Sequence, residues 1–217
     1  MSDFAELRER MVRRQIEARG IADPTILDAF REVPREAFVD EGHRQSAYDD
    51  QPLPIEAGQT ISQPYMVAVM IEAVEISSGD VVLEVGSGSG YAAAVISRIA
   101  RAVIGIERQH DLVVSARERL QCLGYDNVMI VKGDGTRGWP DEAPFDAILA
   151  SATGSHVPTA LIDQLAPGGR LVMPIGDPAN VQDLIKIVKR GDGSLIEENL
   201  GRVRFVPLIG EEGWRED

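Results

Sequence analysis

Disulfides and membrane spans are the first features that this sequence lacks. Its only cysteine, Cys122, cannot form an internal disulfide, which fits a reducing compartment. No apolar run approaches the roughly 20 residues of a membrane span. Charged side chains stand near the start of the chain, where a secretory signal needs an apolar stretch. We therefore expect a cytoplasmic protein without a membrane partner.

Basic side chains and metal ligands are also scarce. Lysine and arginine number 22 against 35 acidic residues, which gives a formal net charge of −13. This charge repels a phosphate backbone, so a nucleic-acid substrate is disfavoured. The three histidines, His43, His110 and His156, lie far apart without the spacing of a ligand set. We expect them on the surface or at helix ends, and we expect no metal site.

The residues that are present predict a single domain, residues 1–217. Hydrophobic residues make up 44% of the chain, which is long enough for a full hydrophobic core. We divide the domain into an N-terminal part (1–78), made of helices and a long loop, and a sheet-forming part (79–217). An apolar stripe predicts a helix that ends at Gly20, and Asp23 with Pro24 begins a second one. Both helices should cover an edge or a face of the sheet.

Residues 81–91 form the stretch around which the chain is organised. Residues 81–85 have the pattern of a strand buried on both faces, and a helix follows from Tyr91. The turn between them contains Gly86, Gly88 and Gly90. Such a turn brings backbone N–H groups and a helix N-terminus to one point and leaves room for a nucleoside-like ligand.

Strands and helices then alternate along the rest of the chain. Helices are predicted at 110–123 and 157–165. Strands are predicted at 102–106, 128–131, 145–150, 170–174, 184–188 and 203–207. The last two have no room for a helical crossover between them, so they should be antiparallel. The pattern predicts an α/β fold, a doubly wound and mostly parallel seven-stranded sheet with an antiparallel C-terminal strand.

Two nucleoside cofactors compete for the glycine turn. A dinucleotide needs G-x-G-x-x-G, but Tyr91 occupies the third glycine position. Glu84 would repel a pyrophosphate and attract an ammonium or sulfonium group. Glu107 and Asp134 end the next two strands, where they can reach a ribose and an adenine, although each can also be an ordinary strand-end or turn acid. The three acids together favour S-adenosyl-L-methionine.

A proline-rich loop at residues 47–65 is the second informative stretch. A loop of this length in a compact domain is more often functional than accidental. Ser62 lies at its end, just before a helix with Pro64 in its first turn. Either Ser62 or Gln63 should cap that helix, and the Ser62 hydroxyl can alternatively bind an anionic group at the helix N-terminus.

These two stretches resemble the protein-L-isoaspartate O-methyltransferase family. The similarity is carried by residues 47–65 and 82–91, and it continues through 133–135, 145–148, 165–176 and 206–208. It extends from about residue 5 to the C-terminus. Many methyltransferases share the glycine motif, whereas residues 58–65 make the assignment specific.

The resemblance implies a Rossmann-like fold and a protein repair reaction. A methyl group passes from S-adenosyl-L-methionine to the free α-carboxylate of an L-isoaspartyl residue in a damaged peptide or protein, leaving S-adenosyl-L-homocysteine. The ester would close to a succinimide that can reopen to aspartate. Ser62 matches the active-site serine, residues 206–214 should fold back near the cofactor, and the chain should act as a monomer. The expected cofactor contacts are Gln59, Thr60, Ile61, Ser62, Glu84, Gly86, Ser87, Gly88, Gly90, Glu107, Asp134 and Gly135.

Two departures leave substrate choice open. Glu56 stands where the family usually has a small residue, and residues 151–153 replace a more alanine-rich run. A methyltransferase for a small metabolite or an RNA base is one alternative, disfavoured by residues 58–65 and by the acidity. A non-catalytic cofactor-binding module is another, which would have no need of Ser62.

Overall fold

The sheet has seven strands, as predicted, in a computed structural model that describes residues 4–215. Their order is β5-β4-β3-β6-β7-β8-β9. The first five strands in this order are parallel to one another: β5 (Val128–Lys132), β4 (Ala102–Glu107), β3 (Val81–Val85), β6 (Phe145–Ala150) and β7 (Leu165–Ile175). The strands β8 (Gln182–Lys189) and β9 (Leu195–Val203) are added by antiparallel pairing. The predicted fold class is confirmed.

The position of the last strand was predicted wrongly. We expected it at 203–207, but β9 ends at Val203. Residues 195–199 are exposed at the edge of the sheet and include Glu197 and Glu198. An edge strand exposed to solvent lacks the apolar run that marks a buried strand, so its pattern is weak.

Alternate residues along the strands enter two separate cores, one on each face of the sheet. On β3, Val82 belongs to one core, and Leu83 and Val85 belong to the other. The first core contains residues of α3 (Pro64–Ala73), α4 (Tyr91–Ser97) and α5 (His110–Cys122). The second contains Leu161 of α6 (Thr159–Asp163). Helices therefore cover both faces of the sheet. Because the five strands are parallel, their carboxyl ends lie along one edge, which the helices leave open.

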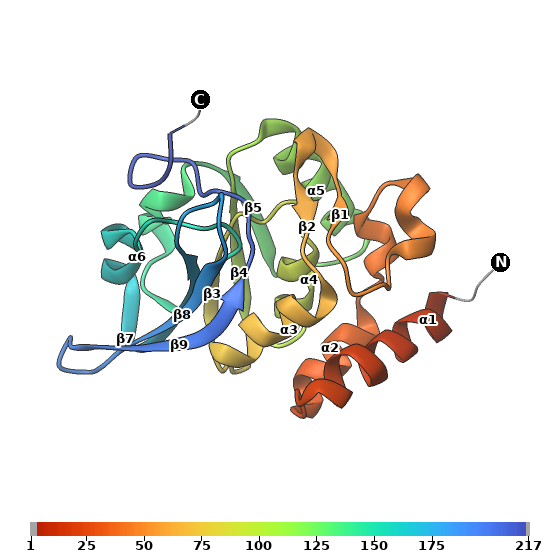
Figure 1. Cartoon of the computed structure of the whole chain (residues 1–217), viewed down its shortest axis with the longest axis horizontal. Helices are drawn as coiled ribbons and strands as arrows, with labels where there is room; N and C mark the ends of the chain where they lie inside the picture. The colour runs from red at the N-terminus through yellow and green to blue at the C-terminus, as the bar shows by residue number, and fades with distance from the viewer. Residues whose placement is uncertain (1–3, 216–217) are drawn as a thin grey trace.

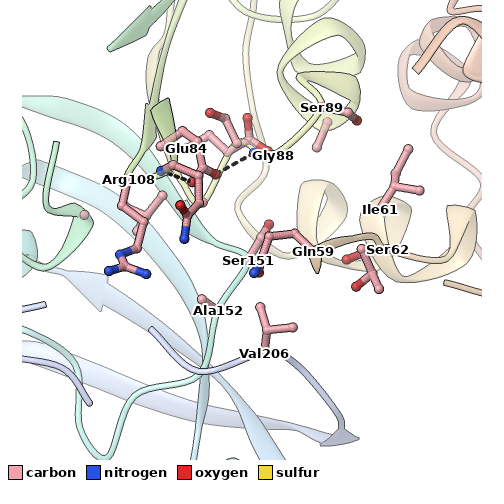
Figure 2. Close-up of a pocket in the computed structure, with 18 of the residues that line it drawn as sticks. Gln59, Ile61, Ser62, Glu84, Gly88, Ser89, Arg108, Ser151, Ala152 and Val206 are labelled. Carbon is pink, nitrogen blue, oxygen red and sulfur yellow. Dashed lines mark hydrogen bonds between the residues drawn. The ribbon is translucent and has the colours of Figure 1, made fainter. Parts of the chain in front are cut away.

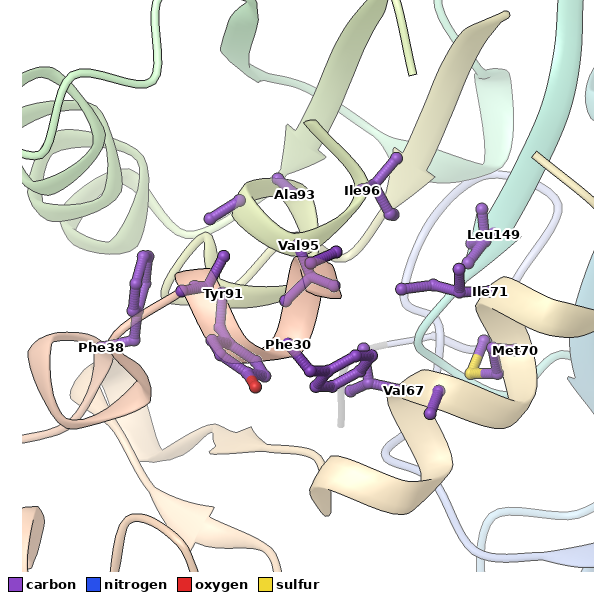
Figure 3. Close-up of a cluster of buried hydrophobic side chains, with 14 of the residues drawn as sticks. Phe30, Phe38, Val67, Met70, Ile71, Tyr91, Ala93, Val95, Ile96 and Leu149 are labelled. Carbon is purple, nitrogen blue, oxygen red and sulfur yellow. The ribbon is translucent and has the colours of Figure 1, made fainter. Parts of the chain in front are cut away.

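The N-terminal helices form an outer layer on this helical layer rather than on the sheet. They are α1 (Phe4–Met11), which continues through irregular turns to Gly20, and α2 (Pro24–Glu32). Asp23 caps α2 by accepting a hydrogen bond from Thr25, as predicted. Phe30 and Phe38 pack edge-on against Tyr91 of α4, with ring centroids 6.3 and 5.5 Å away (Figure 3). Aromatic contacts of this geometry fix the outer layer on α4.

The loop at 47–65 contains a small hairpin of its own. The strand β1 (Leu53–Pro54) pairs antiparallel with β2 (Thr60–Ile61), and the turn Glu56–Gly58 joins them. This hairpin lies above α3 and α4 at the carboxyl end of the sheet (Figure 1). The proline-rich loop therefore stands next to the glycine turn.

Candidate active site

A cavity of about 550 Å³ opens at the carboxyl ends of β3 and β4. Its walls come from the hairpin, the glycine turn, the ends of β4 and β6 and a C-terminal segment (Figure 2). The lining residues are Ala57, Gly58, Gln59, Thr60, Ile61, Ser62, Val67, Glu84, Val85, Gly86, Ser87, Gly88, Ser89, Tyr91, Ala92, Ile106, Glu107, Arg108, Gln109, Gly135, Ser151, Ala152, Val206, Pro207, Leu208 and Ile209. Ten of the twelve expected contact residues therefore share one cavity; Gly90 and Asp134 are absent from this wall.

The glycine turn needs its glycines for backbone conformation. Gly86, Gly88 and Gly90 have φ angles of 81°, 52° and 86°, in the left-handed region that disfavours a Cβ. The N–H groups of Gly86 and Ser87 donate to the carbonyl of Ile106 and tie the turn to β4. Gly90 is the N-cap of α4, so its place in the turn is structural.

Glu107 is held at the cavity by two backbone N–H groups. Gly88 donates to Oε2 at 3.0 Å and Gln109 donates to Oε1 at 2.9 Å. The residue is only 6% exposed. Each carboxylate oxygen can accept more than one hydrogen bond, so Glu107 remains able to accept two vicinal hydroxyls. This geometry fits the predicted contact with a ribose.

Glu84 is a buried acid whose Oε2 has no hydrogen-bond partner. Burial, and secondarily the nearby Glu107, raise the pKa of its carboxyl to about 8. Glu84 is only 1% exposed, although it lines the cavity. An unpartnered buried carboxyl next to a cavity is stabilised as an anion when a cation binds there. Glu84 thus fits the predicted ammonium or sulfonium contact.

Ser62 does not cap α3. The N-cap of that helix is Gln63, which has no side-chain cap hydrogen bond. The capping interpretation of Ser62 is therefore wrong. Ser62 instead lines the cavity, and its carbonyl accepts a hydrogen bond from Nη2 of the fully buried Arg35 at 2.7 Å. Nε of Arg35 donates to the carbonyl of Ala47, so one guanidinium holds both ends of the loop.

Asp134 lies just outside the cavity wall, next to the lining residue Gly135, and its contact with an adenine stays a prediction. Its Oδ1 accepts from the N–H and the hydroxyl of Thr136, and its Oδ2 accepts from the N–H of Glu211 at 2.8 Å. Partial burial raises the pKa of Asp134, but the bonds from Glu211 and Thr136 outweigh this effect and lower it below its ordinary value. Asp134 therefore anchors the C-terminal segment rather than the cavity wall.

The C-terminal segment folds back to the cavity, as expected for residues 206–214. Thr153 exchanges backbone hydrogen bonds with Val206 and Leu208, and Nε1 of Trp214 donates to the Thr153 carbonyl at 2.9 Å. Residues 206–209 close one side of the cavity. Thr153, one of the departing residues, thus has a structural role.

Several lining residues were missed by the sequence reasoning. Arg108 and Gln109 directly follow Glu107, so the strand-end position that indicated Glu107 could also have indicated them. Ile209 lies within residues 206–214, for which the family resemblance implied a fold-back to the cofactor, although it was not singled out as a contact. None of the three histidines lines the cavity. Among residues 4–215, no group of three or more potential ligands is placed to hold a metal ion.

Known proteins are similar to this chain over nearly its whole length. A model of the protein-L-isoaspartate(D-aspartate) O-methyltransferase family matches residues 6–213. A protein-L-isoaspartate O-methyltransferase 2 from Pelobacter propionicus is 56% identical over 95% of this chain and 92% of its own length. A protein-L-isoaspartate O-methyltransferase from Methanoculleus marisnigri is 52% identical over 96% of this chain and 94% of its own.

Solved structures agree with these relatives. A protein-L-isoaspartate O-methyltransferase superposes with a TM-score of 0.86 at 32% identity, over 94% of this chain and 66% of that one. A Plasmodium falciparum protein in complex with S-adenosyl-L-homocysteine gives a TM-score of 0.80 at 29% identity, over 93% and 98%. The chain belongs to the protein-L-isoaspartate(D-aspartate) O-methyltransferase family.

Proposed function

We propose that this chain methylates the free α-carboxylate of L-isoaspartyl residues in damaged peptides and proteins, with S-adenosyl-L-methionine as the donor. The observation that supports it most is the single cavity that joins the glycine turn and Glu107 to the loop containing Ser62. Family membership supplies the reaction class. The ester formed would close to a succinimide and so return part of the damage to aspartate.

The residues of the cavity fit the cofactor. Glu107 would hold the ribose, the turn at Gly86 and Gly88, which has no Cβ in the way, would lie against the adenosine, and Glu84 would pair with the cationic end. The cofactor supplies an activated methyl group on a sulfonium. A carboxylate is already a nucleophile at neutral pH, so the protein needs no strong base and contributes mainly by placing the two reactants in line.

Gln59, Ser62, Ser151 and Val206 line the cavity (Figure 2), and we assign the acceptor to this part of it. In this proposal Ser62 orients the isoaspartyl carboxylate, and Gln59, Thr60 and Ile61 contact the cofactor from the hairpin. Ser62 is joined to the buried guanidinium of Arg35 only through its carbonyl, which leaves the hydroxyl for a ligand. The hydroxyl is therefore our candidate for the catalytic group.

The proposal also includes the oligomeric state of the active enzyme and its cellular compartment. We place the reaction in the cytoplasm, in keeping with a single cysteine. We propose a monomer as the active form. No helix within residues 4–215 has the length and apolar character required to cross a membrane.

A paired peptide assay tests the function. An isoaspartyl peptide and its aspartyl twin are incubated with the enzyme and methyl-labelled cofactor. We expect base-labile methyl ester on the isoaspartyl peptide and little on its twin. Equal labelling of both peptides would overturn the proposal, as would labelling of RNA or a small metabolite but of neither peptide.

A further inference from the structure

The hairpin between Leu53 and Ile61, called here the flap, is an outer wall of the cofactor cavity. Residues 57–61 of the flap line the cavity. Only two residue pairs join its strands, Leu53 with Ile61 and Pro54 with Thr60. A ladder this short does little to fix the position of the wall over the cavity. Contacts with the rest of the fold must therefore hold the flap down.

The turn of the flap is also in an unfavourable backbone conformation. Ala57 has φ 56° and ψ 25°, in the left-handed region, and Gly58 follows with φ 67°. Alanine rarely adopts this region because its Cβ approaches the following carbonyl. Such a conformation persists only when its surroundings enforce it.

Two contacts bind the flap to the glycine turn. The Glu56 carboxylate pairs with Nη2 of Arg119 on α5 at 3.1 Å, and Nη1 of the same guanidinium donates to the carbonyl of Ser89 at 2.8 Å. The two side chains are 32% and 17% exposed. Ile55 also packs closely on the turn, because a Cβ added to Gly88 would lie 3.3 Å from its Cδ1. One arginine thus bridges the flap and the turn on which the adenosine is proposed to bind.

We infer that Glu56 and Arg119 form an ionic latch that keeps the flap closed over the bound cofactor and slows its release. Glu56 is absent from the cavity wall, so it acts by positioning the flap. The departure from the family pattern at Glu56 thereby has a partner in the fold. The inference rests on the proposed cofactor site, but it concerns the residence time of the cofactor rather than the methyl acceptor.

The test measures how fast labelled S-adenosyl-L-homocysteine leaves the protein after dilution into excess unlabelled compound. Glu56→Gln should raise the release rate by about two- to fivefold, the effect expected of a partly exposed ion pair. Added salt should speed release from the wild type and have much less effect on the variant, because salt screens only the charged pair. The melting temperature should stay close to that of the wild type.

Glu75→Gln is the matched control. It removes an ion pair with Lys186, 2.6 Å long and also partly exposed, that lies outside the cavity wall. This variant should keep the wild-type release rate and its salt dependence. Equal release from the Glu56→Gln and Glu75→Gln variants would overturn the latch.

A double variant shows whether Glu56 acts through Arg119. Arg119→Gln should speed release more than Glu56→Gln, since it also loses the bond to Ser89. Glu56→Gln added to Arg119→Gln should have little further effect; a full additional increase would contradict the pairing. If the compound binds but isoaspartyl peptides are not methylated, the proposed function fails while these release rates still decide the latch. If the wild type does not bind the compound, the latch is overturned.

Discussion

Three acidic residues near the cavity differ in role because their partners differ. Glu107 accepts from two backbone N–H groups, Asp134 accepts from Thr136 and Glu211, and Oε2 of Glu84 has no partner. Asp134 is consequently an anchor, and its charge is already satisfied. Glu84 is the acid whose charge depends most on what occupies the cavity.

Glu84 should make cofactor binding depend on pH. With a pKa raised to about 8, its carboxyl is mostly protonated at neutral pH in the ligand-free protein. A bound cation favours the carboxylate, so S-adenosyl-L-methionine should release a proton on binding, and its affinity should rise by up to about tenfold per pH unit below 8. Calorimetry in two buffers of different ionisation enthalpy measures this proton.

Glu84→Gln supplies the comparison. Its cofactor affinity should be weaker and nearly independent of pH, and a wild-type profile that is equally flat would refute the linkage.

The stability of the ligand-free protein should change with pH in the opposite direction to the cofactor affinity. A folded-state pKa above the unfolded one means that the ligand-free wild type loses stability as pH rises from the ordinary glutamate pKa to about 8. The variant should lack this loss.

Ser62→Ala separates catalysis from folding. Because the N-cap is Gln63, the substitution should change the free energy of unfolding by no more than about 0.5 kcal/mol. Loss of one positioned donor should lower kcat by about 10²-fold or more, with a much smaller change in cofactor affinity. Melting temperature, affinity and kcat measured on one preparation would decide; a near-normal kcat would remove Ser62 from the catalytic role.

Single site residues were predictable where a strand end alone determines their position. Glu84 and Glu107 could be found because parallel strands deliver their carboxyl ends to one edge. Asp134 follows the same rule and its adenine contact stays a prediction, but its hydrogen bond with Glu211, 77 residues later in the chain, was not predictable. A pairing over that separation leaves no mark in the local pattern.

At the scale of elements, β4 and the glycine turn approach each other closely at Gly105. Gly105 pairs with Glu84 on β3 and Ile130 on β5. A Cβ at this position would lie 2.6 Å from Cδ1 of Ile130 and 2.9 Å from Cβ of Ser87. The end of the Ile130 side chain can move, but Ser87 can move only together with the turn.

Gly105→Ala should therefore displace the cofactor turn. We expect a loss of about 1–3 kcal/mol in the free energy of unfolding, as for other overpacked interiors, together with weaker cofactor binding. Urea unfolding and calorimetry measure the two effects. Gly191→Ala, with no atom near its added Cβ and no left-handed φ, is the control and should change neither. Unaltered cofactor affinity in Gly105→Ala would show that the turn does not respond to β4.

The elements themselves were predictable in proportion to their burial. β3 is buried on both faces and appeared in the sequence with its observed limits, residues 81–85. The helix expected at 157–165 is shorter, Thr159–Asp163, because Pro158 is its N-cap and Leu165 already belongs to β7. Such boundaries depend on tertiary pairing, which competes with the helical pattern.

Over the whole molecule, the sheet places the site but does not enclose it. The strands supply Glu84 and Glu107, while the flap and residues 206–209 supply the remaining walls. The flap precedes the sheet-forming part in the chain and residues 206–209 follow its last strand, and contacts such as Thr153 with Val206 hold the second wall in place. The general class of site was thus readable from the order of strands, whereas its enclosure required the three-dimensional structure.

The exposed outer edge of β9 has a consequence for how such a protein meets its substrates. An unpaired edge offers backbone donors and acceptors to any extended chain, and it can begin aggregation. Leu195 and Ile196 are 45% and 40% exposed there, and Glu197 and Glu198 follow them directly. An enzyme proposed to act on aged, partly unfolded chains would repeatedly meet extended segments whose backbone groups are unpaired. We expect the two glutamates to raise the desolvation cost of any strand that docks and to repel acidic ones, and so to keep the enzyme from being trapped by the material it is proposed to repair.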